Sequence, residues 1–247
     1  MRLTAKHKFA CLTYHVIGEG TNQYTLRKGQ LHAHLRFLKA EDYIVDDFEG
    51  LETGLRSHQF VPSRYVVLTV DDGHDSSMRA ADVLQAYGYR ATFFLTRDRC
   101  LGKPHFVREP QIRELRKRGF SIGTHGTTHR KFTFMPEQLC VQELRASKQW
   151  LEDVIGEEVR YTAAPGGYID GRVLRLAYGC GYVLAATCAE LTNSPETITL
   201  PGKVNRVNVR QHFSLRTFRH AVEGYAGFYL WRQFRAAALT VPKRLLG

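Results

Sequence analysis

Two pairs of side chains that could bind a metal ion stand directly after short apolar stretches of the sequence. Asp71 and Asp72 follow the apolar stretch 66–70, and His125 and His129 follow the shorter stretch 120–123. One carboxylate oxygen and two imidazole nitrogens make a complete set of protein ligands for a catalytic zinc-type ion. The second Asp would then be left to act as a base. The sequence therefore predicts a metal site with a base beside it.

Each pair also has an ordinary explanation. Asp-Asp-Gly at 71–73 is a common turn, because Asp and Gly are turn formers. Adjacent side chains on a strand point to opposite faces, so Asp71 and Asp72 should have different roles. The two histidines are four residues apart, and the Gly-Thr-Thr between them indicates a turn rather than the middle of a helix. Both pairs at strand ends together favour the metal site.

Apolar strands alternate with amphipathic helices along the chain, which is typical of a parallel sheet or barrel. We expect helices at 27–38, 77–87, 111–118, 136–155 and 171–178, and about seven strands at 9–14, 66–70, 91–95, 120–123, 159–163, 182–186 and 204–209. In such folds the chemistry lies at the carboxyl ends of the strands. The residues that directly follow a predicted strand are His15, Asp71, Asp72, His125 and Pro165.

A Pro-Gly-Gly turn, Pro165-Gly166-Gly167, ends one of the predicted strands. The simplest interpretation is a tight turn. The functional one is a backbone N–H, from Gly166 or a neighbour, that approaches an oxyanion without steric obstruction.

Composition sets limits on the class of protein. A chain of 247 residues that is 43% hydrophobic fits one α/β domain with a sizeable core. The net charge of +11 favours anionic partners, although a solvated basic surface is the simpler explanation. No zinc-finger spacing, basic heptad region or RNP-like strand occurs, so nucleic acid is not an expected partner.

The sequence also bears on location. No stretch of about 18 apolar residues occurs that would span a membrane. The basic start, residues 1–8, is followed by an apolar stretch broken at His15, Gly18 and Glu19, which is unlike a signal peptide. The five cysteines show no Cys-x-x-Cys spacing, which indicates reduced thiols. We therefore expect a cytoplasmic protein.

Residues 1–224 are expected to form the main domain, and residues 225–247 a basic, aromatic C-terminal segment. This segment contains Arg232, Arg235, Lys243 and Arg244 and no acid. Either it lies on an anionic membrane surface, at the inner face of the membrane, or it is a helix packed against the barrel.

The order of these motifs resembles the polysaccharide deacetylase family, also known by its NodB homology and as carbohydrate esterase family four. The resemblance runs from about residue 9 to residue 209 and rests on five motifs: Tyr-His at 14–15, Leu-Thr-Val-Asp-Asp-Gly at 68–73, Ala-Thr-Phe-Phe at 91–94, Gly-Thr-His-Gly-Thr-Thr-His at 123–129 and Ala-Pro-Gly-Gly at 164–167. It implies a deformed (β/α) barrel of about seven parallel strands and metal-dependent N-deacetylation of amino sugars. By motif position, Asp71 would be the general base, and Asp72, His125 and His129 the metal ligands.

The sequence departs from the family pattern at three motifs. Ala163 stands where an Arg usually orients the base, the Asp…Asp-Trp motif has no equivalent near residues 187–190, and the closing Leu-x-His that usually supplies the general acid is absent. These losses motivate an alternative, a glycan-binding or scaffold protein with impaired turnover. A second alternative is deformylation of a lipid-linked amino sugar.

The sequence is thus interpreted as a divalent-metal hydrolase that removes an N-acyl group, N-acetyl in the first place, from an amino sugar in a glycan or in a lipid- or nucleotide-linked precursor. Zinc fits the ligand types best, and nickel, cobalt or manganese would suit them nearly as well. Asp71 takes a proton from water, and a protonated His donates to the leaving amine. His15 is the preferred donor because it ends the first strand, and His212, after the last strand, is the alternative.

Overall fold

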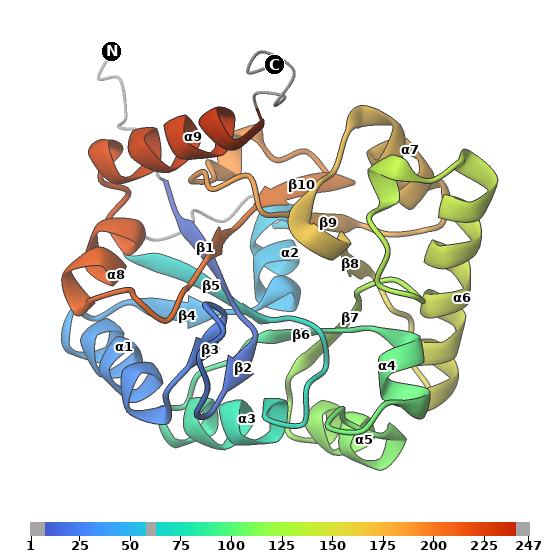
Figure 1. The fold of residues 1–247 in the computed structure, drawn as a ribbon, viewed down its shortest axis with the longest axis horizontal. Helices are drawn as coiled ribbons and strands as arrows, with labels where there is room; N and C mark the ends of the chain where they lie inside the picture. The colour runs from blue at the N-terminus through green and yellow to red at the C-terminus, as the bar shows by residue number, and fades with distance from the viewer. Residues whose placement is uncertain (1–7, 58–62, 241–247) are drawn as a thin grey trace, which may run out of the picture.

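Parallel strands form a single large sheet that curves into a barrel (Figure 1). The computed structural model describes residues 8–57 and 63–240, of which residues 235–240 are described by their backbone alone. Hydrogen bonds join the strands in the order β10-β9-β8-β7-β6-β5-β1-β11, and β4 pairs with β5 outside this path. The strands are β1 (Ala10–Tyr14), β4 (Ile44–Asp46), β5 (Tyr65–Val70), β6 (Thr92–Leu95), β7 (Ser121–Thr124), β8 (Tyr161–Ala163), β9 (Leu184–Thr187), β10 (Gly202–Asn205) and β11 (Val207–Asn208).

One extended segment joins the two edges of this sheet. β10 pairs with β9, and β11 pairs with β1, although only Arg206 separates β10 from β11 in the chain. The ring is therefore built from seven segments, and the predicted barrel of about seven parallel strands is confirmed. The last predicted strand, 204–209, differs in being divided at Arg206, where its pairing changes partner.

Alternation along the strands sorts side chains between the barrel interior and the surrounding helices. On β5, Tyr65 and Val67 belong to an inner cluster of buried residues, and Val66 and Leu68 to an outer one. Both faces are buried, so the strands are apolar throughout, as is typical of parallel sheets. The remaining inner residues come from several strands of the ring and from helix α2 (Phe48–Arg56), and are Phe9, Cys11, Phe48, Leu51, Phe94, Tyr161, Ala163, Leu184, Ala186 and Val204.

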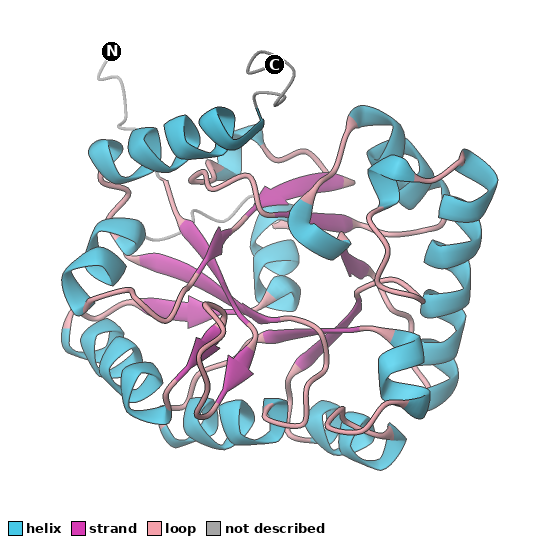
Figure 2. Ribbon diagram, viewed as in Figure 1, coloured by secondary structure: helices cyan, strands magenta, loops and turns pink. Residues whose placement is uncertain are grey.

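Helices surround the ring of strands (Figure 2). The predicted helices are confirmed within a few residues, as α1 (Lys28–Ala40), α3 (Ser77–Ala86), α5 (Glu109–Lys117), α6 (Glu137–Ile155) and α7 (Gly171–Gly179). Three others were not predicted, α2 (Phe48–Arg56), α4 (Arg97–Gly102) and α8 (Leu215–Val222). Short 3₁₀ turns lie at Phe132–Phe134, Pro165–Gly167 and Pro195–Thr197.

Helix α2 closes the amino-terminal end of the barrel. Its residues Phe48 and Leu51 belong to the inner cluster, and the Phe48 N–H donates to Thr92 Oγ1 at the start of β6 (2.9 Å). Phe48 also contacts Phe94 edge-on, with ring centroids 5.3 Å apart. The amino end is therefore filled by side chains, which leaves the carboxyl end for a site.

Two further elements frame the carboxyl end. Strands β2 (Val16–Ile17) and β3 (Thr25–Leu26) form a small separate sheet. Helix α9 (Ala226–Thr240) contains most of the expected C-terminal segment, and its Phe228 packs edge-on against Phe213. The expected basic residues Lys243 and Arg244, and the side chain of Arg235, lie outside the described residues. Within the described part of the chain, no helix combines the length and the apolarity needed to span a membrane.

Candidate active site

The alternation of the strands carries Asp71 to the inner face of the barrel at its carboxyl end. Asp71 lies two residues beyond Thr69, which is fully buried, and its N–H donates to Tyr14 O (2.9 Å). The chain then turns sharply, because both Asp72 and Gly73 have positive φ (77° and 79°). At Gly73 a Cβ would lie 2.9 Å from Cys100 Sγ, so only glycine fits this turn. Adjacent carboxylates thus reach different parts of one site.

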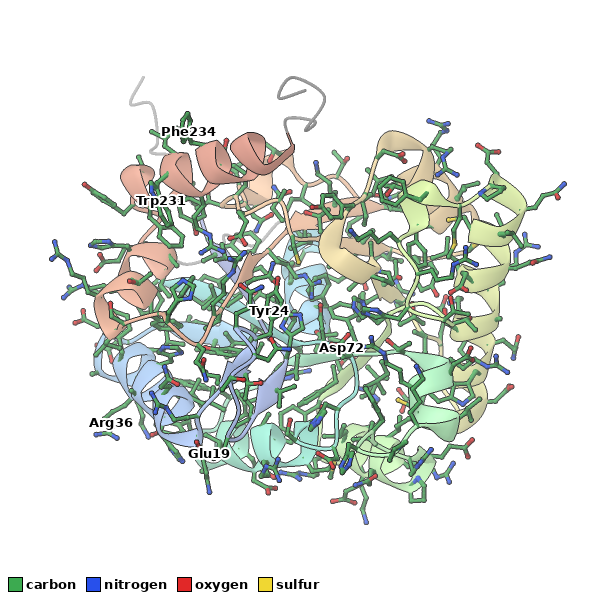
Figure 3. The ribbon with its side chains drawn as sticks, in the orientation of Figure 1. Glu19, Tyr24, Arg36, Asp72, Trp231 and Phe234 are labelled. Atoms are coloured by element: carbon green, nitrogen blue, oxygen red, sulfur yellow. The ribbon has the colours of Figure 1, made fainter. Side chains whose placement is uncertain are left out.

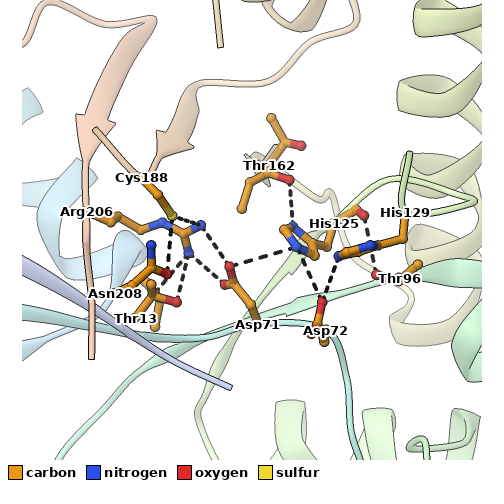
Figure 4. Close-up of polar contacts among 12 residues, drawn as sticks. Thr13, Asp71, Asp72, Thr96, His125, His129, Thr162, Cys188, Arg206 and Asn208 are labelled. Carbon is orange, nitrogen blue, oxygen red and sulfur yellow. Dashed lines mark hydrogen bonds and ion pairs between the residues drawn. The ribbon is translucent and has the colours of Figure 1, made fainter. Parts of the chain in front are cut away.

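Asp72, His125 and His129 converge as a candidate metal-binding group. Their ligand atoms all lie within 4.8 Å of one another (Figure 4). Asp72 Oδ1 is 2.9 Å from His129 Nε2 and 3.6 Å from His125 Nε2. One carboxylate oxygen that faces two imidazole nitrogens is a donor set that fits a divalent ion such as zinc. Arg99 also lies 2.8 Å from this oxygen, so part of its charge is already balanced.

A backbone carbonyl orients His125. Its Nδ1 lies 2.8 Å from Ala163 O at the end of β8, and a carbonyl can only accept a hydrogen bond. The proton is therefore on Nδ1, and Nε2 keeps its lone pair toward Asp72 and Asp71. Burial lowers the pKa of His125 to about 4 although both carboxylates oppose this shift, so the ring is neutral at pH 7. Neutral imidazole is the form that binds metals.

Glu143 of α6 fixes the loop between the two histidines. Its carboxylate accepts hydrogen bonds from the N–H groups of Thr127 (2.8 Å) and Thr128 (2.9 Å) and from Thr128 Oγ1 (2.6 Å). Gly126 and His129 have positive φ (73° and 66°), so the histidines converge across a turn and not along a helix. Sequence reasoning missed Glu143, because an acid inside a long helix carries no mark of a loop contact.

Arg206 holds Asp71 through a bidentate ion pair. Its Nη1 lies 2.6 Å from Oδ1 and its Nη2 2.8 Å from Oδ2, and both side chains are fully buried. Burial by itself would raise the pKa of Asp71, but Arg206 and then His125 outweigh this and hold the pKa below its usual range. Arg206 thus makes the contact that the expected Arg at position 163 would have made. Its signal in the sequence is an Arg at an inward position two residues after Val204.

Side chains of the barrel interior contact the Arg206 guanidinium and hold it in place. It lies over the ring of Phe94 at 5.2 Å, and its Nη1 contacts Thr69 Oγ1 (3.0 Å) and Thr13 Oγ1 (3.3 Å). At Gly123 a Cβ would come within 2.5 Å of the Phe94 ring, so this glycine gives the ring its place. Packing of the barrel core therefore sets the position of the ion pair between Arg206 and Asp71.

A cavity of about 250 Å³ opens over these groups. Four candidate site residues, Asp71, Asp72, His125 and His129, line it together with His15. The His15 ring packs against Tyr24, with centroids 4.8 Å apart, and its Nδ1 is buried without a hydrogen-bond partner among the described residues. Burial lowers the pKa of His15, and Asp71 and Asp72 oppose that effect.

The other predicted residues lie around this cavity. His212 is exposed and lines a neighbouring cavity instead. Gly166 and Gly167 line the site cavity, whereas Pro165 is buried behind them. The Gly167 N–H donates to Ala164 O (2.8 Å), and no hydrogen bond of the Gly166 N–H is found among the described residues. At Gly167 a Cβ would lie 2.3 Å from that of Cys188, so glycine is required there.

Comparison with known proteins agrees with this architecture. A family model described as polysaccharide deacetylase matches residues 59–185, which is just over half of the chain. A putative polysaccharide deacetylase of Bacillus subtilis, YxkH, is 26% identical over 73% of this chain and 64% of its own length. A peptidoglycan-N-acetylglucosamine deacetylase of Bacillus cereus is 27% identical over 48% of this chain and 54% of its own. The chain thus spans less than two thirds of the length of these relatives.

Solved structures share the fold. A Streptococcus pyogenes deacetylase, PplD, in complex with acetate superposes with a TM-score of 0.80 at 21% identity, covering 89% of this chain and all of that one. IcaB from Ammonifex degensii superposes with a TM-score of 0.76 at 20% identity, covering 92% of this chain and 97% of its own.

Proposed function

Because this chain belongs to the polysaccharide deacetylase family, we propose that it is a divalent-metal hydrolase that removes the N-acetyl group from an amino sugar. The substrate is an N-acylated glycan or a lipid- or nucleotide-linked precursor of one. The observation that carries the proposal is the convergence of Asp72, His125 and His129 beside a fixed carboxylate, Asp71.

The ligand types favour zinc, and nickel, cobalt and manganese are the other candidates. When bound by Asp72, His125 and His129, such an ion supplies Lewis-acid polarisation of the acyl carbonyl and acidifies water. The His125 proton on Nδ1 faces Ala163 O, which leaves Nε2 for the ion. The Arg99 guanidinium lies 2.8 Å from Asp72 Oδ1 and donates to His129 Nδ1 (3.0 Å), which places the His129 proton on Nε2 toward Asp72, so binding of the ion requires this proton to leave Nε2.

Asp71 acts as the general base. The Arg206 ion pair keeps it ionised and holds both oxygens in place, while Oδ2 also lies 3.9 Å from His125 Nε2, the nitrogen that would bind the ion. A carboxylate in this position can accept the proton of the attacking water. The N–H of Gly166 is available to the oxyanion of the tetrahedral species.

His15 acts as the general acid for the leaving amine; because burial lowers its pKa, it takes up the proton that Asp71 removes from water and passes this proton to the amine. It lines the same cavity as Asp71, and its Nδ1 has no partner among the described residues. His212 lines the neighbouring cavity and not the cavity that Asp71 lines, so it is the weaker candidate. The roles of both histidines are separable by mutation.

The alternative of a scaffold protein without turnover depended on the absent Arg at position 163 and on the absent Leu-x-His. Arg206 supplies the equivalent contact to Asp71, which favours an enzyme. The deformylase alternative changes only the acyl group. A cytoplasmic location stays a prediction, and residues 1–7, on which it partly depends, lie outside the described residues.

Mass spectrometry of a panel of acylated amino sugars tests the proposal. Metal-loaded protein is incubated with N-acetyl and N-formyl sugars, free, oligomeric, and lipid- or nucleotide-linked. We expect loss of an acetyl group from at least one of them, and no such loss with His125→Ala or His129→Ala, which should also lose stoichiometric metal by elemental analysis. Metal retained by both variants would show that the site is wrong, and bound metal without any acyl loss would favour the scaffold.

A further inference from the structure

A second cavity lies beside the active-site cavity, under helix α9. Its volume is about 470 Å³, which is within the usual range for small-molecule sites. Five residues line both cavities: Tyr24, Gly166, Gly167, Cys188 and Asn208. We call this second space the outer chamber. A group attached to the reacting sugar would enter it.

The outer chamber carries an excess of positive charge. Its charged lining residues are Lys203, Arg210, Arg232 and Glu190, so three cations against one anion give +2. Glu190 is already paired with Arg232, because both its oxygens lie 2.5 Å from the Arg232 guanidinium and both side chains are largely buried. Lys203 and Arg210 make no ion pair among the described residues, so no described side chain neutralises their charges.

Arg210 has an unsatisfied hydrogen-bond donor. Its Nε is buried and has no partner among the described residues, and its Nη1 makes only a long contact of 3.4 Å to Gln23. The guanidinium lies 5.9 Å from the centre of the Tyr24 ring, which in turn packs on His15. A buried guanidinium donor that lacks an acceptor is suited to a ligand oxyanion.

Aromatic rings complete the lining. Tyr24 and Trp231 both line the outer chamber, and Trp231 comes from α9. In Figure 3 Tyr24 appears between Asp72 at the active site and Trp231 on α9. Flat rings of this kind offer apolar faces to the C–H groups of a sugar. The lining therefore suits a group that is both a carbohydrate and anionic.

We propose that the outer chamber binds an oxyanion, a phosphate or carboxylate, carried on the unit attached to the N-acetylated sugar, with Arg210 and Lys203 as its ligands. This inference depends on the proposed function and specifies its substrate as an anionic glycan or glycosyl phosphate. The Glu190–Arg232 pair fixes α9 as one wall of the chamber. Arg210 and Lys203 determine specificity and take no part in the acyl transfer.

The test uses substrates matched except for charge. Metal-loaded full-length protein is given a neutral N-acetylglucosamine disaccharide, the same sugar linked to a uronic acid, and N-acetylglucosamine 1-diphosphate. We expect the wild type to prefer at least one anionic substrate. Arg210→Gln should lower the ratio of kcat/KM for anionic over neutral substrate by about 10- to 100-fold, which corresponds to one charged hydrogen bond. Lys203→Gln should lower it in the same direction.

Arg145→Gln is the matched control, since Arg145 is an exposed residue of α6 that lines neither cavity. It should leave the ratio unchanged. A preference confined to the uronic acid or to the diphosphate identifies the source of the oxyanion. An equal rate on neutral and anionic substrates, or a ratio that Arg210→Gln leaves unchanged, overturns the proposal.

Calorimetric titration of metal-free protein with the same three compounds separates this inference from the proposed function. If no compound is deacetylated, the proposed function fails. The calorimetric affinities still show whether the outer chamber binds an oxyanion. Tighter binding of an anionic compound that Arg210→Gln weakens and Arg145→Gln does not would support it. Equal binding of the three compounds would refute it.

Discussion

Asp71 and Glu52 are both buried carboxylates paired with an arginine, but they lie at opposite ends of the barrel. At the carboxyl end, the Asp71 carboxylate accepts hydrogen bonds from one side chain, Arg206, and faces a cavity. At the amino end, Glu52 accepts hydrogen bonds from Arg160, Arg56 (2.6 Å) and Tyr161 (2.8 Å). The arginines at this end are partly exposed, at 32% and 55%, whereas Arg206 is completely buried.

Under the proposed function, this difference separates a carboxylate that does chemistry from one that stabilises the fold. Hydrogen-bond donors already occupy the carboxylate oxygens of Glu52. Glu52 lines neither the active-site cavity nor the outer chamber, so no substrate bound there can reach it. Asp71 keeps its orientation through one buried arginine while facing a space where water and substrate can enter. A buried ion pair alone indicates neither role, and access to a cavity decides between them.

The largest effect is expected from Asp71→Asn. This variant should keep its metal and its fold but lose the proton acceptor, which lowers kcat by about 10²–10⁴-fold. The corresponding change at the amino end, Glu52→Gln, should leave kcat within twofold of the wild type. Steady-state kinetics with elemental analysis measures both. Near wild-type turnover of Asp71→Asn would remove the distinction between the two ends.

The next largest effect concerns the general acid. His15→Ala should lose most of the turnover, about 10²-fold, because no other group then protonates the leaving amine. Metal content should not change. His212→Ala is the matched comparison, with a small effect on kcat. If His212→Ala shows the loss and His15→Ala does not, the two assignments are reversed.

Substitution of the arginines compares the two ion pairs directly. Arg206→Lys keeps the charge but loses the bidentate geometry, so kcat should fall by about 10-fold or more while KM and metal content stay close to the wild type. Arg160→Lys, at the amino end, should change none of these kinetic values. A change in KM without a change in kcat would show that Arg206 acts on binding and does not position Asp71.

Substitution of Glu52 should change the free energy of unfolding and its dependence on pH. Burial tends to raise its pKa, but hydrogen bonds from Arg160, Arg56 and Tyr161 outweigh this and lower the pKa from 4.5 to about 2. A lowered pKa stabilises the fold above pH 4.5, and the contribution is lost as pH falls toward 2. Glu52→Gln should therefore cost about 1–2 kcal/mol of unfolding free energy at pH 7. In urea titrations the difference from the wild type should shrink below pH 4.5; a constant difference would contradict this.

The smallest effect is expected at the outer face of α9, where Leu230 and Phe234 are 66% and 74% exposed. We expect peripheral contact with anionic vesicles through these side chains. Arg232, by contrast, is buried against Glu190 and cannot serve a membrane. Replacing Leu230 and Phe234 by Ser should reduce co-sedimentation with anionic vesicles about two- to fivefold. Equal sedimentation of both proteins would exclude this contact.

Local patterns in the sequence predicted most of the fold and the convergence of the candidate metal-binding residues. The strand ends at Tyr14, Val70 and Thr124 follow from short apolar stretches, and they place Asp71 and His125 at one end of the barrel. Strand β4 and helix α2 were missed because their stretch is short and mixed in polarity. Helix α2 is stabilised by tertiary packing, because Phe48 and Leu51 fill the amino-terminal end of the barrel.

Arg206 could not be paired with Asp71 from the sequence, because 135 residues separate them. Their contact depends on the change of pairing between β10 and β11, which no local pattern encodes. The motif position at 163 suggested instead that the orienting Arg was missing. In the structure Ala163 provides a backbone carbonyl to His125, and the arginine comes from another strand.

The division of the last strand at Arg206 also has a consequence for synthesis of the chain. The proposed base and metal ligands all precede residue 130, but Arg206, which orients Asp71, is synthesised later, in the segment that joins β9 to β1. A ribosome-bound chain that ends before this segment has an open barrel and an unheld Asp71. Catalytic competence should therefore appear together with ring closure, so that hydrolysis itself reports the final long-range step of folding.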